Sequence, residues 1–491
     1  MTAEALASVE GVAVAGGSRR NQLRAWALTA FFVAVSAVAV AANELFVYAV
    51  AYLWFGFIFG MALQRGRFCF SSGFRDLFAV GTPRMIVGLM IATVLFGLTA
   101  AVVSAMGMST FRAAPFGAHS LVAGLIFGVG MVFAGGCASS SFYKVGEGNL
   151  TSLIVVATMG VTQAVFVTSG GWLDSLVPGA WRASALAKGL PASVTVETGW
   201  FDQYTAGYLW DHPGVRVAEA IGLSSDSATG AFVANFLLGS LLPALASLAL
   251  VYAFWARKGF MKRWKRDGKA PGPRAELAGF WAMVKASPTT AVVGILLGVA
   301  AGLHMFVMKG LRLKFGIENA AEILTATGHA SGLSARGTVH DPGIWTVATH
   351  STQWAGWALD KLGWNVMSSV YFGWSEGIPN PIFNLAGWMS IALVGGAAVM
   401  ALLSDEFSIK KPTLELASFA VFGGVLMGVG ARLGLGCNIG AFFSRVGNGD
   451  LSGWLFAAGM TGGAWIGVKF FNWWTERKMA KEMAAAPDLP L

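Results

Sequence analysis

Charged residues are scarce in this chain: Asp, Glu, Lys and Arg make up only 12% of its 491 residues. Because globular domains carry about 25% charged residues, this scarcity excludes an ordinary soluble protein. Hydrophobic residues reach 55%, and the mean hydropathy is +0.63. Apolar runs of about 20 residues, the length that spans a bilayer as a helix, recur along the chain. The composition therefore predicts an all-α polytopic membrane protein.

Cysteine is scarce as well, since the chain has three cysteines, too few and too scattered for a disulfide framework or a structural zinc site. The spacings of the histidines between residues 304 and 350 match no compact ligand motif (His304, His329, His340 and His350). No ATP-binding motif is present. The net charge of +9 needs no nucleic-acid partner, because Lys and Arg gather in loops beside the membrane. We expect neither a metal nor another cofactor.

The apolar runs predict about ten spanning helices, near residues 25–43, 46–63, 84–106, 118–134, 151–169, 231–255, 287–307, 383–403, 415–435 and 451–472. The charges of the loops predict their orientation. The stretch 257–274 carries eight bases and one acid, whereas 170–230 carries three bases and six acids. By the positive-inside rule, the first is cytoplasmic and the second external. Both termini are then cytoplasmic.

The expected organisation has six parts. They are a cytoplasmic tail (1–24), a first transmembrane repeat unit (25–169), an external insertion (170–230), a linking helix with a basic cytoplasmic loop (231–286), a second, inverted repeat unit with an external segment at 309–380 (287–472), and a cytoplasmic tail (473–491). The segment 309–380 is expected to hold re-entrant or interfacial helices, or an extra pair of spans. The roles of both external segments stay open.

An internal repeat relates the two units. GLIFGVGMVFAGGC (124–137) and GVLMGVGARLGLGC (424–437) share six identities, and after a one-residue slip VGEGNL (145–150) matches VGNGDL (446–451). The expected spans of the two units run in opposite directions. Inverted repeats with glycine-rich interruptions are typical of transporters, whose site lies between the halves. We therefore expect re-entrant half-helices that meet at a central constriction.

All three cysteines lie in breaks between apolar runs: RGRFCFSSGFRD (65–76), GGCASSSFYKVGEGN (135–149) and GLGCNIGAFFSRVGNGD (434–450). Small polar residues after each cysteine favour a short half-helix, whose N-terminal N–H groups attract anions. A base follows in each break, and these bases are candidates for anion attraction (Arg75, Lys144 and Arg445). A thiol is a weak donor and a polarizable partner. The pattern predicts a site for a small anion with a soft, sulfur-seeking end.

The residues expected to line the substrate path are the three cysteines and their neighbours (Cys69, Cys137, Cys437, Gly136, Gly436 and Asn438). In the predicted topology Cys437 receives the anion outside, and Cys137 and Cys69 pass it inward. The break near 311–319, which is equivalent to that of Cys69, has no cysteine. One thiol is therefore unpaired by the repeat.

The strings GRFCF, GC followed by GEGN, and GCNIGAFFS resemble the YeeE/YedE family of sulfur-compound uptake proteins of bacterial membranes. The resemblance implies an inner-membrane protein that transports thiosulfate between two inverted halves. It also implies that Cys69, Cys137 and Cys437 line the path and contact thiosulfate through S–H···S interactions without covalent change. A cytoplasmic sulfur acceptor, TusA-like or a rhodanese, is the partner it implies. The middle motif departs from the family in following Cys137 with Ala138 and three serines, which leaves the exact substrate open.

Other functions remain open at this stage. A selenium compound or another sulfur species is an alternative substrate. In a membrane sulfurtransferase, a thiolate at Cys69 or Cys137 would take the sulfane sulfur as a persulfide and release sulfite, but no obvious general base accompanies either cysteine. A channel or scaffold for a sulfur-oxidation complex would suit the enlarged external segments. Ion coupling and oligomeric state are not predicted. We expect a transporter and not an enzyme.

Overall fold

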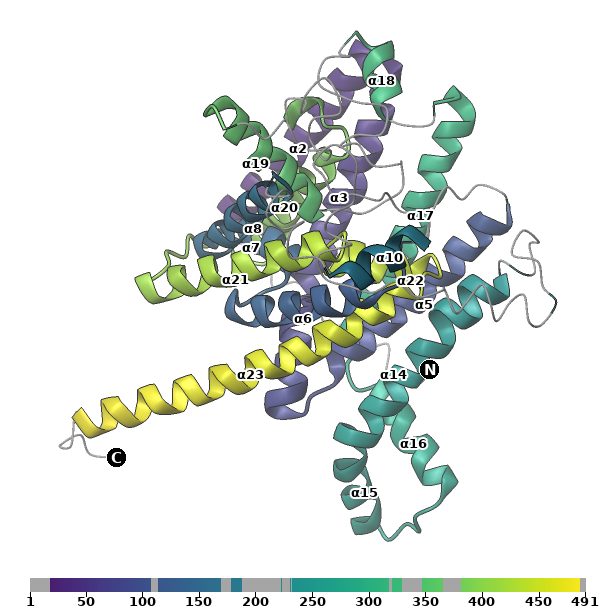
Figure 1. Ribbon diagram of the computed structural model, residues 1–491, viewed down its shortest axis with the longest axis vertical. Helices are drawn as coiled ribbons and strands as arrows, with labels where there is room; N and C mark the ends of the chain where they lie inside the picture. Colours follow the sequence, from purple (N-terminus) through teal and green to yellow (C-terminus); the bar gives the residue numbers. More distant parts are fainter. Residues whose placement is uncertain are drawn as a thin grey trace.

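A computed structural model describes residues 18–106, 114–168, 178–187, 222, 230, 232–317, 320–328, 347–364 and 381–485. Within these ranges the chain is almost entirely helical and forms no strand, apart from one isolated bridge between Asn149 and Lys410. Long helices surround several short ones at the centre (Figure 1). The fold is that of a polytopic membrane protein, as the composition predicts.

Seven helical stretches of the described chain are long and apolar enough to cross a membrane. They comprise α2 (Arg19–Ala42), η1 (Glu44–Phe46) with α3 (Val47–Gly66), α4 (Phe70–Arg75) and η2 (Asp76–Val80), α5 (Arg84–Ala105), α6 (Ala118–Phe133) with α7 (Ala138–Gly146), η3 (Phe232–Leu241) with α14 (Leu242–Val251), η4 (Tyr252–Ala256) and α15 (Arg257–Arg266), α17 (Pro288–Phe315), and α21 (Leu414–Leu433). Two apolar helices are shorter, α8 (Leu150–Thr168) and α20 (Gly387–Leu403). With α23 (Ser452–Ala485), these helices coincide with all ten expected spans.

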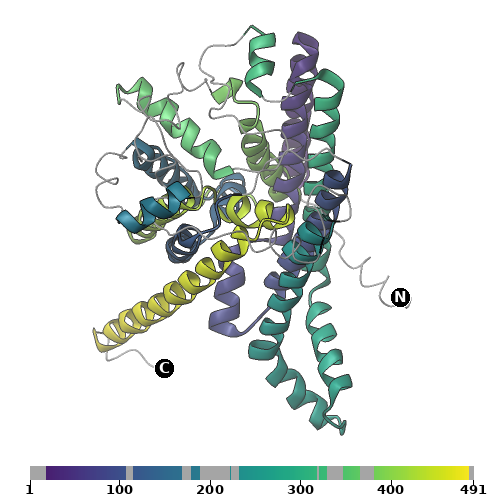
Figure 2. The ribbon, with the colours of Figure 1, turned by 45° about the vertical axis from the view of Figure 1, so that its right-hand side comes forward.

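The other described helices are α10 (Gly179–Ala187), α16 (Pro273–Val284), α18 (Ala320–Ala326), α19 (Val347–Lys361), η5 (Pro381–Phe383), η6 (Asn438–Ser444) and α22 (Arg445–Gly447). The basic stretch 257–274 forms α15 and the start of α16, which project together as a hairpin (Figure 2). Much of the two external segments, 170–230 and 309–380, lies outside the described residues. Within them α10, α18 and α19 are described, together with the end of α17.

Several helix boundaries differ from the prediction, most clearly at the two ends of the chain, and α17 continues to Phe315 beyond the expected 307. The first helix begins at Arg19 instead of residue 25, because the Ser18 side chain accepts a hydrogen bond from the N–H of Asn21 and caps it. The last helix continues to Ala485, beyond the expected end at 472. Its final turns contain Glu, Lys, Met and Ala, which are strong helix formers. Both expected tails are therefore partly helical.

Four helix pairs pack in parallel: α3 with α20, α5 with α17, α6 with α23, and α8 with α21. The contacting residue numbers rise together in each pair; for example, Gly56 meets Met389 and Gly60 meets Leu393. In the predicted repeat, the counterparts of α3, α5, α6 and α8 are α17, α20, α21 and α23. When each helix is replaced by its counterpart, the pair α3–α20 becomes α17–α5, and the pair α6–α23 becomes α21–α8. Two inverted units produce this pattern, which supports the predicted repeat.

The glycines of the repeat allow these close approaches. A Cβ on Gly124 would meet the carbonyl oxygen of Phe456, and one on Gly424 would lie 2.9 Å from Cβ of Thr158 and 3.2 Å from the carbonyl oxygen of Val155. The two glycines are equivalent in the repeat, because their numbers differ by 300. Phe456 and Val155 are equivalent as well, because their numbers differ by 301 after the one-residue slip. Small residues that let helix backbones touch are the usual means of packing helices in a membrane.

The one-residue slip of the repeat appears as a change of helix type. Eight residues separate Cys137 from Val145, whereas nine separate Cys437 from Val446, counted as differences in number. The first segment is the regular helix α7, and the second begins with the π-helix η6. A π-helix accommodates an extra residue inside a helix, so both sequences return to the same register at their VG dipeptides.

Candidate functional site

Each cysteine lies at the N-terminus of a short helix. Cys69 precedes α4, Cys137 precedes α7 and Cys437 precedes η6, and all three have extended backbone torsions. All are free thiols and almost fully buried. The half-helices expected after the cysteines are therefore present, and each thiol lies beside backbone N–H groups that lack an intrahelical acceptor.

The turn before each cysteine has one shared geometry. Two residues before the thiol, the backbone is left-handed, at Arg67 (φ 47°), Gly135 (φ 66°) and Leu435 (φ 54°). The N–H of this residue and of the next bond back to carbonyls of the preceding helix, which is the Schellman arrangement. The left-handed backbone at the non-glycine residues Arg67 and Leu435 costs about 1–2 kcal/mol each. At Gly436 (φ 155°) a Cβ would lie 2.7 Å from the backbone nitrogen of Ala441.

Two of the thiols are in contact. The sulfur atoms of Cys69 and Cys137 are 4.0 Å apart, about twice the length of a disulfide bond. The Cys69 thiol donates to the hydroxyl of Ser140 at 3.0 Å, and Cys137 lies 3.4 Å from the hydroxyl of Ser139. Asn438 donates to that same Ser139 hydroxyl at 3.4 Å. A continuous chain of sulfur and polar atoms therefore links α4, α7 and the first residue of η6.

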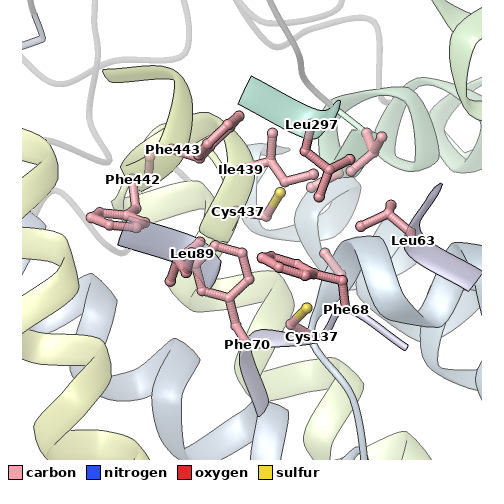
Figure 3. Close-up of a cluster of buried hydrophobic side chains, with 14 of the residues drawn as sticks. Leu63, Phe68, Phe70, Leu89, Cys137, Leu297, Cys437, Ile439, Phe442 and Phe443 are labelled. Carbon is pink, nitrogen blue, oxygen red and sulfur yellow. The ribbon is translucent and has the colours of Figure 1, made fainter. Parts of the chain in front are cut away.

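The third thiol lies apart from this pair. Figure 3 shows Cys137 and Cys437 facing one apolar cluster, with the ring of Phe68 drawn between the two sulfur atoms and that of Phe70 beside it. The Phe70 ring also packs edge-on against Phe442, at 5.9 Å between centroids. Aromatic side chains thus surround the region between the Cys437 half-helix and Cys137.

A cavity of about 260 Å³ opens beside Cys69. We call it the vestibule; its lining is Arg67, Cys69, Ser72, Arg75, Gly135, Tyr143, Lys144, Glu147, Glu406 and Lys410. The lining contains four bases and two acids. An excess of positive charge next to a thiol suits a small anion with a sulfur end.

The two acids of the vestibule differ in their surroundings. Burial raises the pKa of Glu147 above its usual range. Burial also acts to raise the pKa of Glu406, but hydrogen bonds from Arg67 and Gln64 outweigh it and hold that pKa below its usual value. The Arg67–Glu406 ion pair, 2.9 Å long, joins the end of α3 to the loop after α20. Glu406 is thus a charged partner of the vestibule wall.

The structure brings two of the three predicted bases together. Arg75 and Lys144 both line the vestibule, and Lys144 also donates to the carbonyl oxygen of Gly135 at 2.7 Å. The predicted path residue Gly136 leaves room for this lysine, because a Cβ there would lie 3.3 Å from its nitrogen. Arg445 is not part of this cavity. It is buried elsewhere and donates to the Ser452 hydroxyl at 3.4 Å.

Sequence reasoning missed part of the vestibule. Arg67 stands two residues before Cys69, so its place in the break was a usable signal. Lys410 and Glu406 lie in the loop after α20 and reach the vestibule only through tertiary packing. Tyr143 and Glu147, both in the second break, also line the cavity.

Two of the four clustered histidines are described, and neither resembles a metal ligand. His304 is buried against the rings of Tyr52 and Phe55, at 5.2 and 4.8 Å between centroids. His350 pairs with the hydroxyl of Ser390. The described residues contain no group of three or more His, Cys, Asp or Glu that could hold a metal ion. His329 and His340 lie outside the described residues.

Comparisons with known proteins show the family of the chain. A family model described as Sulphur transport matches residues 65–466, a range that includes all three cysteines. The thiosulfate transporter TsuA of Spirochaeta thermophila is 25% identical over 419 residues, which cover 84% of this chain and 96% of that protein. TsuA of Escherichia coli is 25% identical over 418 residues, covering 84% and 89%. The probable transporter YedE of Escherichia coli is 31% identical over 148 residues, or 29% and 37%.

Proposed function

Since the chain belongs to the sulphur-transport (YeeE/YedE) family, we propose that it imports thiosulfate, or a closely related small sulfur anion, along a path lined by its three cysteines. The family and its named transporters make the protein a membrane transporter of sulfur compounds and not an enzyme. The observation that carries the finer proposal is the contact between Cys69 and Cys137 beside a basic vestibule.

The path begins at Cys437 and ends in the vestibule. Thiosulfate carries a soft terminal sulfur and a hard, charged sulfonate. A thiol offers the sulfur a polarizable, weak hydrogen-bond partner, while Arg75 and Lys144 attract the sulfonate. Each contact is weak enough for release, as conduction between successive sites requires. The anion passes Cys437, then the Cys137–Cys69 pair, and leaves through the vestibule.

The orientation of the protein is part of the proposal. The basic hairpin of α15 and α16 places its end of the bundle in the cytoplasm by the positive-inside rule. The end of α4 and the start of α5 lie at this same end, since Trp255 of η4 packs on Phe78 of η2. The vestibule then faces the cytoplasm of a bacterium, with both termini inside. A cytoplasmic sulfur acceptor, TusA-like or a rhodanese, would take thiosulfate there.

Uptake of thiosulfate whose two sulfur atoms carry different labels tests the function. The measurement uses proteoliposomes or a host without its own thiosulfate uptake. We expect both labels to enter together, because the thiols contact the anion without a covalent step. Entry of the sulfane label alone, or its retention on the protein, would show the rival sulfurtransferase. If neither label enters while the protein is folded, thiosulfate is the wrong substrate, and selenite and sulfite are tested next.

Lys144→Gln is expected to raise the KM of uptake about tenfold, equivalent to ~1.4 kcal/mol, because a positive charge beside Cys69 is lost. Lys144→Arg should recover most of the affinity. Lys262→Gln is the matched control, since Lys262 lies on the exposed helix α15, away from the vestibule. An unchanged KM in Lys144→Gln would remove this base from the path.

A further inference from the structure

The helix α19 carries a run of polar residues deep inside the bundle. Thr349, His350, Ser351, Thr352 and Gln353 are all buried, with exposures between 0% and 8%. The helix packs on α8 and lies beside α20 (Figure 1). Polar side chains are costly inside a membrane and commonly mark a functional path. This helix comes from the segment 309–380, to which the sequence assigned no role.

The first turn of α19 reaches the third thiol. The backbone N–H of Ala348 lies near the Cys437 thiol, together with the N–H groups of Gly440 and Ile439 in η6. The carbonyl oxygen of Ala348 accepts a hydrogen bond of 3.3 Å from the side chain of Gln163, on α8. Ala348 is therefore tied to α8 by a hydrogen bond and lies close to Cys437.

The placement of α19 mirrors that of α4. The helix α4 packs on α23 and α5, and α19 packs on α8 and α20, their counterparts under the exchange of units. Phe70 of α4 contacts Phe442, whereas Trp354 of α19 contacts Phe142, at 6.1 Å between centroids. The element that reaches Cys437 is thus α19, and not the break near 311–319 that the sequence predicted as the equivalent of Cys69.

Two side-chain hydrogen bonds hold α19 in this position. His350 Nδ1 lies 2.7 Å from the hydroxyl of Ser390, in the first turn of α20. Asn384 donates to the side-chain oxygen of Gln353. Both contacts lie at the end of α20 that is remote from Glu406 and the vestibule. They therefore fix α19 on the side from which substrate would approach Cys437.

We infer that α19 closes the Cys437 site, and that the His350–Ser390 hydrogen bond is the contact that positions it. The effect of α19 on substrate binding rests on the proposed transport function. His350 and Ser390 are positioning residues, because they act on Cys437 through the first turn of α19. Loosening this contact would open Cys437 to solvent and weaken the hold on an external anion.

Modification of Cys437 by a maleimide, followed by peptide mapping of the purified, otherwise unchanged chain, tests the inference. His350→Gln and Ser390→Ala remove the hydrogen bond, and we expect Cys437 to be labelled about tenfold faster, the effect of losing one buried hydrogen bond. His350→Asn is the matched control, because its amide replaces the Nδ1 atom that faces Ser390. Its labelling rate should stay near that of the unsubstituted protein.

Uptake kinetics give the second measurement. His350→Gln should raise the KM for thiosulfate while its maximal rate changes less, and His350→Asn should restore the KM. Equal labelling of Cys437 in all variants would overturn the inference. Labelling does not depend on transport, so absence of thiosulfate uptake by the unsubstituted protein would refute the proposed function while the labelling result still decides the role of α19.

Discussion

Cys137→Ala is expected to abolish thiosulfate uptake while the protein remains folded. Cys137 contacts Cys69 on one side and, through Ser139, Asn438 on the other. Cys137 is therefore the thiol that connects Cys69 to the start of η6. Its replacement removes the soft contact from the proposed path and leaves a small void. We expect initial uptake rates to fall to the background of empty vesicles.

Ser141→Ala is the matched control for this change. Ser141 follows Cys137 on the same half-helix and is equally buried, but its hydroxyl donates to the Cys137 carbonyl and contacts no sulfur. This variant should retain uptake. Cys137→Ser adds a second comparison, because a hydroxyl has the hydrogen-bonding capacity of a thiol without its polarizability. Full activity in Cys137→Ser would mean that hydrogen bonding alone suffices, and full activity in Cys137→Ala would refute the relay.

Gly463→Val is expected to have the largest effect on stability. A side chain on Gly463 would strike the carbonyl oxygen of Leu125, on the neighbouring helix α6. Because a backbone carbonyl cannot move aside as a side chain can, α6 and α23 must separate. We expect a loss of about 3 kcal/mol in the free energy of unfolding, at the upper end of overpacking effects, seen as a lower melting temperature and aggregation in detergent.

Gly462 provides the comparison on the same helix. No atom lies within 4 Å of a Cβ built there, so Gly462→Val faces open space. Its folding and melting temperature should match those of the unsubstituted protein, since valine is no worse than glycine in a helix. Equal damage from both substitutions would show that α6 and α23 tolerate separation, and that the close approach is not needed for stability.

The sequence was informative about each break because the relevant contacts are local. Gly135, Cys137 and the serines after it lie within a few residues, and their backbone preferences specify a turn, a cap and a short helix. The apolar runs likewise predicted the spans. Helix ends were less predictable: α23 continues past 472 because helix propensity in its last turns outweighs the loss of apolar character.

The assembled site could not be read from the chain. Lys410 reaches the vestibule from a loop more than 260 residues after Lys144, as their numbers show, and no local pattern connects them. Arg445 lies eight residues after its cysteine, much as Lys144 lies seven after its own, yet it lies outside the vestibule. Such a spacing describes position along the chain and not the side of the molecule that the residue faces. Ala348 belongs to the long segment 309–380, and no pattern in the sequence of that segment predicts that its helix α19 lies near Cys437.

The π-helix η6 also bears on how the two halves could exchange sequence. If the segment 138–144 replaced 438–445, the chain would lose one residue between Cys437 and Val446. The replacing segment forms a regular helix in its own place, so the extra residue and the π-helix that holds it would be lost together. Val446 would then keep its register, and its carbonyl would still accept the hydrogen bond from the hydroxyl of Ser240. A difference of one residue between two copies of a repeat is therefore no barrier to the exchange of sequence between them.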